Sequence, residues 1–220
     1  MVRLSGLFMG EAYTFNAVAW QPRRARVLIA LRDVYTSPTI LGNYSVTSIA
    51  EPAWPAAIHG VFRQQGVRQV AYVPDAGHRR LIELCRADSD MRAIALTSEQ
   101  EGMGLLAGAW LGGERGALLM QSSGVGNCIN TLASITQACQ FPLFMLVTMR
   151  GEWGEGNPWQ IPMGRAVAPV LETLGIRVTA VTHSDDVEPT VAAMLAMSYT
   201  TSTASAVLLS QRLLGAKAFQ

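Results

Sequence analysis

The sequence predicts an α/β fold in which a parallel sheet carries helices on both faces. From residue 53 onward, short apolar runs alternate with longer stretches of helical periodicity. The runs are continuously hydrophobic instead of alternating with polar residues, which is typical of parallel strands covered on both sides. Crossovers between such strands are right-handed, and functional residues gather in the loops that leave the carboxyl ends of the strands.

The first elements follow from apolar spacing and chain breakers. Residues 54–65 predict a helix because Ile58, Val61 and Phe62 share one face and Gly66 follows its end. Residues 70–73 predict a strand, which Pro74 ends. Next along the chain we expect a helix at 78–87, a strand at 91–96, a helix at 99–111 rich in Ala, Leu, Gly and Met, and a strand at 117–120.

The remaining elements continue the same alternation. Residues 125–139 predict a helix with Val125, Ile129 and Leu132 on one face. After it we expect a strand at 143–148, a helix at 166–174, a strand at 176–181, a helix at 186–197 and a last strand at 206–209. The loops at the carboxyl ends of the strands are therefore 74–78, 97–100, 121–127 and 149–163.

Residues 1–45 show no clean hydrophobic period, and we treat them as an N-terminal extension ahead of one domain at 46–220. Two interpretations stay open for them. The segment is a real extension, or translation of the native protein starts near Val46. The intact mass of the native protein would distinguish the two.

The composition excludes several classes of protein. Half of the 220 residues are hydrophobic and 15% are charged, which indicates a large core and argues against disorder. A net charge of +1 gives a nucleic-acid surface no electrostatic support. Three cysteines without C-x-x-C spacing favour the cytoplasm. We find neither a membrane-spanning run nor a good signal peptide.

Residues 97–101 lie where a strand ends and a helix begins. Ser98 and Glu101 have the spacing of a capping box, in which the hydroxyl accepts a first-turn amide and the carboxylate reaches back. Capping the helix is a sufficient role for Glu101, whereas Glu99 has no structural role in this motif. Taken alone, Glu99 is best explained as an exposed first-turn acid that the helix dipole favours.

Residues 121–127 place two serines and two glycines between a strand and a helix, where free amides can hold an anion. The pattern is neither a P-loop nor a complete G-x-G-x-x-G, and a tight turn that needs glycine explains it equally well. The Gly-rich, aromatic loop 150–160 is long, and we interpret it as a mobile lid in preference to a surface excursion.

Other chemistries receive little support. Among the histidines only His78 lies near a strand end, and none has a Ser or Cys partner that would indicate a hydrolytic triad. No cluster of His, Cys, Asp and Glu has metal-ligand spacing.

Several segments taken in order resemble one family of enzymes. They are YVPDAGHRRLIELC, TSEQEGMGLLAGAWLGG, GALLMQSSGVGNCINTLASI, TMRGEWGEGNPWQIPMGRA and AVLLSQRLLGAK. They are similar to the alpha subunits of sulfopyruvate decarboxylases and to the amino-terminal domains of phosphonopyruvate decarboxylases, over roughly residues 53–217. The pairing of MQSSGVGN with RGEWGEG…QIPMG is fairly specific to this group, whereas SEQ…LLAG is shared more widely.

The resemblance implies the pyrimidine-binding domain of a thiamine-diphosphate enzyme. In that class one carboxylate hydrogen-bonds N1′ of the aminopyrimidine and favours its imino tautomer. The distance to the LAG segment assigns this role to Glu99, and Glu101 stays an alternative. The resemblance further places a set of residues around the cofactor ring: Gln121, Ser122, Ser123, Gly124 and Asn127. Around the substrate it places Asp75, His78, Arg150 and Gln160.

Enzymes of this class carry a G-D-G…N motif that holds Mg²⁺ and the diphosphate, and this sequence has no G-D-G. The resemblance therefore implies a separate beta subunit and a hetero-oligomer. The expected reaction is decarboxylation of 3-sulfopyruvate to sulfoacetaldehyde and carbon dioxide. The alternatives are phosphonopyruvate or another acidic 2-oxoacid as substrate, and a non-catalytic α/β scaffold subunit.

Overall fold

The computed structural model describes residues 2–8, 11–17 and 52–215. The chain forms two compact units, Met1–Ile49 and Ala50–Gln220. In the described part of the first unit, β1 (Val2–Phe8) pairs antiparallel with β2 (Glu11–Ala17). The sequence predicts no element in this region, because its hydrophobic pattern has no period.

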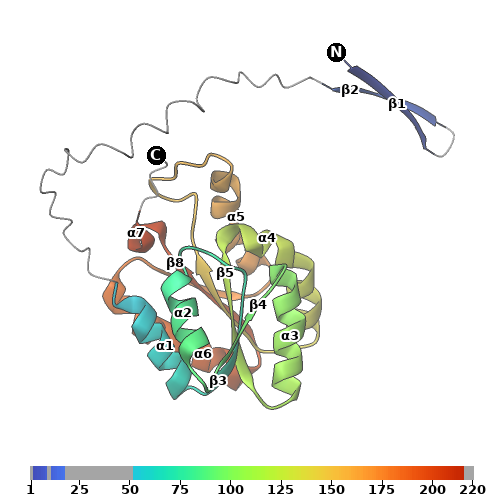
Figure 1. Ribbon diagram of the computed structural model, residues 1–220. Helices are drawn as coiled ribbons and strands as arrows, with labels where there is room; N and C mark the ends of the chain where they lie inside the picture. Colours follow the sequence, from blue (N-terminus) through green and yellow to red (C-terminus); the bar gives the residue numbers. More distant parts are fainter. Residues whose placement is uncertain (1, 9–10, 18–51, 216–220) are drawn as a thin grey trace, which may run out of the picture. The chain divides into compact units, whose positions relative to one another are not determined.

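The second unit is built on a six-stranded sheet in which every pairing is parallel. The strand order is β4-β3-β5-β6-β8-β7 (Figure 1). The strands are β3 (Val67–Tyr72), β4 (Arg92–Ala95), β5 (Arg115–Gln121), β6 (Leu143–Thr148), β7 (Arg177–Val181) and β8 (Ala204–Leu209). The predicted α/β class with a parallel sheet is confirmed.

Helices cover both faces of this sheet. One face packs against α1 (Trp54–Gln64), α2 (Arg79–Ala87) and α6 (Val187–Thr201). The other packs against α3 (Glu99–Leu111), α4 (Ser122–Thr131) and α5 (Gln160–Thr173). In Figure 1, α1 and α2 lie to the left of the sheet and α3 lies to its right. The short elements are a π-helix η1 (Leu132–Ala138), a 3-10 turn η2 (Ser184–Asp186) and α7 (Gln211–Leu214).

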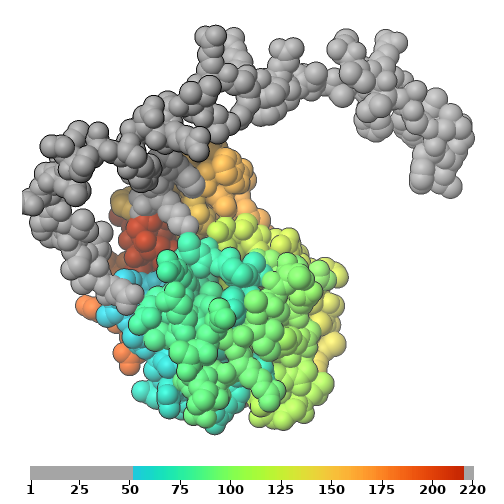
Figure 2. All heavy atoms as spheres, viewed as in Figure 1, coloured from blue at the N-terminus to red at the C-terminus, as the bar shows by residue number. Residues whose placement is uncertain are grey.

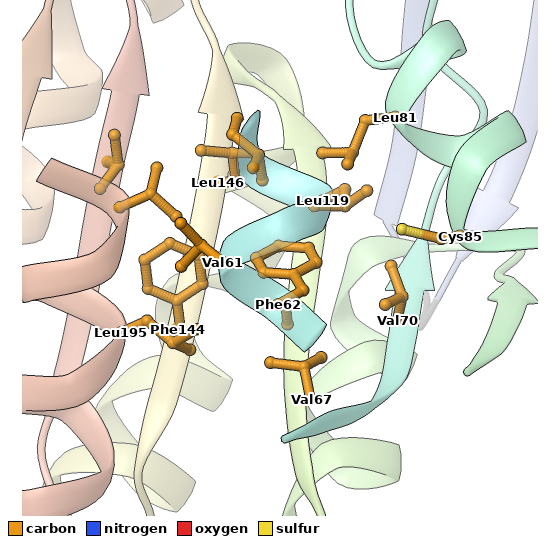
Figure 3. Close-up of a cluster of buried hydrophobic side chains, with 14 of the residues drawn as sticks. Val61, Phe62, Val67, Val70, Leu81, Cys85, Leu119, Phe144, Leu146 and Leu195 are labelled. Carbon is orange, nitrogen blue, oxygen red and sulfur yellow. The ribbon is translucent and has the colours of Figure 1, made fainter. Parts of the chain in front are cut away.

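The strands divide their side chains between two hydrophobic layers. In β6, Phe144 and Leu146 belong to the layer under α1, α2 and α6, whereas Met145 and Val147 belong to the other. Phe62 of α1 meets Phe144 edge-on, with ring centroids 6.2 Å apart (Figure 3). Full burial of each such side chain stabilises the fold by about 1.5–3 kcal/mol. Covering on both faces explains why these strands are continuously apolar.

Two helices begin earlier than the sequence predicts. Helix α5 starts at Gln160 and not at residue 166. Pro162 is tolerated because it lies in the first turn, where backbone amides have no acceptor within the helix and the proline loses no hydrogen bond. Helix α4 starts at Ser122 and not at residue 125, and the final turns of the predicted helix are the π-helix η1.

Candidate active site

Polar side chains from several loops meet where the strands end, at what we call the carboxyl edge of the sheet. Because all six strands are parallel, the loops after β3, β4, β5 and β6 leave from this one edge. The chain passes from β3 outward to β4 and then returns to β5 on the other side of β3, so the crossover direction reverses between β3 and β5. Ligands of open α/β sheets bind at such reversals.

Glu99, the first residue of α3, is buried with 7% of its surface exposed. Its Oε2 accepts a hydrogen bond from Nδ2 of Asn127 in α4, at 2.9 Å. The carboxylate lies directly against Gly124, and a β-carbon at position 124 would collide with it. The structure thus brings together three of the residues assigned to the cofactor ring. An exposed first-turn acid is not what the structure shows at position 99.

Glu101 has a different environment from Glu99. It is exposed, and it accepts hydrogen bonds from the Thr97 hydroxyl at 2.6 Å and the Thr97 amide at 3.0 Å. These bonds lower the pKa of Glu101 below its usual value. The Ser98 side chain makes no capping hydrogen bond. The predicted capping box is therefore wrong in its serine half, and Glu101 reaches back to Thr97.

Asp75 joins the ends of three strands. Its carboxylate accepts hydrogen bonds from the Thr148 hydroxyl at 2.7 Å, the Gly77 amide at 3.0 Å and Gln121 Nε2 at 3.3 Å. Gln121 in turn accepts a hydrogen bond from the Ser123 hydroxyl at 3.0 Å. Asp75, expected near the substrate, and Gln121 and Ser123, expected near the cofactor ring, thus form one network across the carboxyl edge.

His78 lies beneath this network and not on its surface. The ring is fully buried, and Nε2 lies 3.2 Å from the Met120 carbonyl and 3.1 Å from that of Leu146. Two carbonyl acceptors fix the proton on Nε2, and burial lowers the pKa of the imidazole below its usual value, so the ring is neutral. Nδ1 has no hydrogen-bond partner among the described residues. The structure does not bring this side chain to the substrate position that the sequence predicts.

The guanidinium of Arg150 is held by Glu155. Nε and Nη2 of Arg150 donate to the two carboxylate oxygens of Glu155, at 2.7 and 2.6 Å, with both side chains largely buried. Glu155 also accepts hydrogen bonds from the amides of Gly151 and Asn157. The bonds from Arg150 lower the pKa of Glu155 to about 2, so the pair is ionised at neutral pH. Sequence reasoning missed Glu155, whose only signal was a second acid in a Gly-rich loop.

The predicted mobile lid at 150–160 is fastened at several points. The Gln211 side chain accepts hydrogen bonds from the amides of Glu152 and Trp153 and donates one to Glu155, each at 3.1 Å. The Glu152 carboxylate also accepts hydrogen bonds from the Ser210 hydroxyl and the Gln211 backbone amide. The loop and α7 lie at the same end of the domain, coloured orange and red in Figure 2. These hydrogen bonds hold loop 150–160 against α7, as expected of a wall of the site and not of a mobile lid.

A cleft of about 410 Å³ opens between the first turns of α1 and α2, the end of β6, and α7. We call it the α2–α7 cleft. Asp75 and Arg150, two of the residues expected around the substrate, line it, and so do Arg79, Arg80 and Gln211, which the sequence did not single out. The cleft's lining includes neither Glu99, His78 nor Gln160. Gln160 begins α5 and packs its carbonyl against Gly151, where φ is +77°.

In residues 2–8, 11–17 and 52–215, no three His, Cys, Asp or Glu side chains are grouped so as to hold a metal ion. None of the helices in that part of the chain has the length and hydropathy needed to cross a bilayer. The described residues around Glu99 suit a ring with hydrogen-bonding nitrogens.

Alpha subunits of sulfopyruvate decarboxylases are similar to this chain over more than half of its length. No model of a protein family matches the sequence. The sulfopyruvate decarboxylase subunit alpha of Methanothermobacter thermautotrophicus is 35% identical over 153 residues, covering 70% of this chain and 93% of that protein. The Methanocaldococcus jannaschii subunit of the same name is 37% identical over 120 residues, covering 54% and 71%.

More distant similarities extend this picture. The phosphonopyruvate decarboxylase of Streptomyces viridochromogenes is 37% identical over 108 residues, which cover 49% of this chain and 27% of that protein. Among solved structures, a 2-oxoglutarate:ferredoxin oxidoreductase from Magnetococcus marinus has a TM-score of 0.60 at 13% identity, covering 73% of this chain and 29% of that one. At such low identity the structural likeness concerns the fold alone.

Proposed function

The chain belongs to the sulfopyruvate decarboxylase alpha-subunit family, and from this premise we propose that it is the alpha subunit of a thiamine-diphosphate-dependent decarboxylase. The substrate is 3-sulfopyruvate, and the products are sulfoacetaldehyde and carbon dioxide. The observation that carries the proposal is the placement of Glu99, which is buried against Gly124 and bonded to Asn127 beside the reversal in crossover direction between β3 and β5.

Glu99 is the catalytic residue of this proposal. Together with Gln121, Ser122, Ser123, Gly124 and Asn127, it holds the aminopyrimidine ring. Thiamine diphosphate, when bound, supplies the electron sink that lets carbon dioxide leave. Glu99 holds a proton at a ring nitrogen, while Gly124 keeps the space beside the carboxylate clear. Ser122 is turned inward, where its hydroxyl accepts the Arg150 amide at 3.2 Å and fixes the start of α4.

The substrate binds above this ring, at the carboxyl edge. Asp75 and Arg150 line the α2–α7 cleft and are the supported members of the predicted substrate set. His78 acts from below by tying β5 to β6. Gln160 closes the far end of the Arg150 loop.

A beta subunit completes the active site. We propose that it carries the G-D-G…N motif with Mg²⁺ and the diphosphate, since the described part of this chain offers no cluster of metal ligands. The assembly is a hetero-oligomer in the cytoplasm. The thiols of Cys85, Cys128 and Cys139 suit that reducing compartment.

Phosphonopyruvate is the second candidate substrate, favoured by the similarity to phosphonopyruvate decarboxylases. A non-catalytic scaffold role is the candidate from another class. The test is co-expression with the adjacent gene product, addition of thiamine diphosphate and Mg²⁺, and parallel assays of carbon dioxide release from both 2-oxoacids. Faster turnover of sulfopyruvate is expected. Faster turnover of phosphonopyruvate would reassign the substrate, and no turnover of either would overturn the enzymatic proposal.

A further inference from the structure

The last residue of β6 differs in character from the five before it. Residues 143–147 are apolar and buried, whereas Thr148 carries a hydroxyl although it is only 1% exposed. A buried hydroxyl needs a hydrogen-bond partner, because leaving it unpaired costs free energy. Thr148 lies at the carboxyl edge of the sheet, so its hydroxyl can reach the side chains of the candidate site.

The Thr148 hydroxyl has two acceptors within reach. Its Oγ1 lies 2.7 Å from Oδ2 of Asp75 and 3.4 Å from the Met120 carbonyl oxygen. A hydroxyl has one proton to donate, and the shorter bond, to a carboxylate oxygen, is the stronger. Because β5 lies between β3 and β6 in the sheet, the bond from Thr148 to Asp75 spans the end of β5.

Gly77 allows this contact to form. Its backbone amide donates to the same Oδ2 of Asp75 at 3.0 Å. A β-carbon at position 77 would lie 2.7 Å from Cγ2 of Thr148 and 2.8 Å from Oδ2 of Asp75, closer than such atoms approach. The threonine methyl group and the carboxylate therefore pack against bare backbone, and the fold leaves room for both only because residue 77 is glycine.

The other oxygen of Asp75 is bonded as well. Oδ1 accepts a hydrogen bond from Nε2 of Gln121 at 3.3 Å, and the Gln121 amide is itself oriented by the Ser123 hydroxyl. The bond from Thr148 is the shortest of the three bonds described for this carboxylate. Asp75 and Thr148 both line the α2–α7 cleft. The orientation of Asp75 in the cleft thus depends on Thr148.

We propose that Thr148 is a positioning residue that orients Asp75 and affects the reaction only through it. This inference rests on the proposed function, in which Asp75 contacts the substrate in the α2–α7 cleft. Side chains at a reaction site need their own hydrogen-bond partners to hold them in the productive geometry. A misplacement of about 1 Å can cost about a hundredfold in rate.

The test uses the complete complex with its beta subunit, thiamine diphosphate and Mg²⁺, and it measures carbon dioxide release from sulfopyruvate. Thr148→Val keeps the shape of the side chain and removes the donor. Its kcat/KM should fall by about tenfold or more, the effect of losing a hydrogen bond to a charged group. Thr148→Ser keeps the hydroxyl and should retain most of the activity. Thr148→Ala is the second variant without a donor, for use if the valine complex does not assemble.

A double-mutant cycle shows whether Thr148 acts through Asp75. The cycle compares Thr148→Val, Asp75→Asn and the two changes together. Once Asp75 is replaced, Thr148→Val should change kcat/KM by less than about twofold, because coupled residues are not additive. Full multiplication of the two single effects would overturn the inference, since Thr148 would then act independently of Asp75.

Thr136→Val is the matched control. Thr136 is another buried threonine, whose hydroxyl donates to the Leu132 carbonyl within η1, and it does not line the cleft. The control should lower the free energy of unfolding in urea and leave kcat/KM unchanged. An equal loss of kcat/KM in the control and in Thr148→Val would show that removal of any buried hydroxyl has this effect, against the inference.

Further outcomes separate this inference from the proposed function. If the unaltered complex releases carbon dioxide and the hydroxyl-free variants keep its kcat/KM, the inference is overturned alone. A serine variant as inactive as the valine variant would also overturn it. If the unaltered complex releases no carbon dioxide, the proposed function fails and the inference falls with it.

Discussion

Asn127 donates a hydrogen bond to the carboxylate of Glu99, with 2.9 Å between Nδ2 and Oε2, and so joins α4 to the first residue of α3. The side-chain amide nitrogen of asparagine is a donor and never an acceptor. The bond therefore orients Glu99 and leaves its other carboxylate oxygen able to bind a proton. The remaining oxygen faces the Gly124 backbone. This relationship separates Glu99 from Glu101 more clearly than any spacing in the sequence does.

Replacing Glu99→Gln in the reconstituted complex should lower kcat by about a hundredfold or more, as removal of a proton-transferring side chain does. The fold should survive, because glutamine can still accept from Asn127. Steady-state carbon dioxide release measures the effect. Glu101→Gln is the control and should retain nearly full turnover, since Glu101 is exposed and bonded to Thr97. Loss of turnover in the control alone would transfer the catalytic role to Glu101.

Gly124→Ala should weaken cofactor binding. The added methyl group collides with the Glu99 carboxylate, so either Glu99 or the start of α4 must move. The apparent Kd for thiamine diphosphate, measured by titrating activity, should rise. The matched change is Gly60→Ala in α1, where a β-carbon meets no atom within 4 Å. That variant should keep its Kd and unfold at higher denaturant concentration, with a gain of up to about 1 kcal/mol. Equal Kd values for the two variants would contradict a role for Gly124 in cofactor binding.

Glu155→Ala should destabilise the protein by about 2 kcal/mol or more, because it leaves the largely buried Arg150 without its carboxylate partner. The free energy of unfolding in urea measures this. Glu152→Ala, which removes an exposed carboxylate at the start of α7, should cost about 1 kcal/mol at most. A smaller effect at position 155 than at 152 would show that the ion pair does not hold the loop.

The stability of the protein in acid should depend on the same Arg150–Glu155 ion pair. Because the pKa of Glu155 falls from 4.5 to about 2 on folding, its stabilising contribution is complete above pH 4.5 and is lost as the pH falls toward 2. Urea unfolding at several pH values should show a steeper loss of stability in this range for the unaltered protein than for Glu155→Gln. Parallel curves would mean that Glu155 has the same pKa in both states.

His78 should make the protein less stable below neutral pH. Burial lowers its pKa in the folded protein below the ordinary histidine value of 6.5, so the unfolded chain takes up the proton more readily as the pH drops through 6.5. The unfolding free energy should therefore decline toward pH 5 by no more than about 1.4 kcal/mol per pH unit. His78→Gln should lack this decline. An unchanged slope in that variant would indicate that another group titrates.

Sequence patterns predicted the regular part of this fold well. Helix α3 and strand β6 have the predicted bounds: Glu101 bonds back to Thr97 at the start of α3, and β6 is an unbroken apolar run. Asp75 and Gln121, from two of the loops that the sequence places at the carboxyl ends of the strands, are hydrogen-bonded to each other. Elements whose geometry depends on distant contacts were missed. Helix α7 is four residues long, and its first turn is bonded to Glu152, which the local sequence does not show.

At the candidate site, too, the sequence failed to predict features that depend on tertiary contacts. His78 follows a strand end, as a substrate-binding residue would, yet its ring turns into the core because two carbonyls there accept its proton. Loop 150–160 is rich in glycine, as a mobile segment would be. Gly151 nevertheless has φ of +77° and lets the chain pass close to α5, which closes the loop on itself. In both cases the position of the side chain or loop depends on tertiary contacts that the local sequence does not show.

The amide of Gln211 binds the Arg150 loop through both its oxygen and its nitrogen. The last described turn of the chain is consequently a strut for residues that precede it by about sixty positions. A truncation that removes Gln211 would leave the amides of Glu152 and Trp153 without this acceptor and Glu155 without this donor, so the Arg150 loop depends on a residue that the chain reaches only after its last strand.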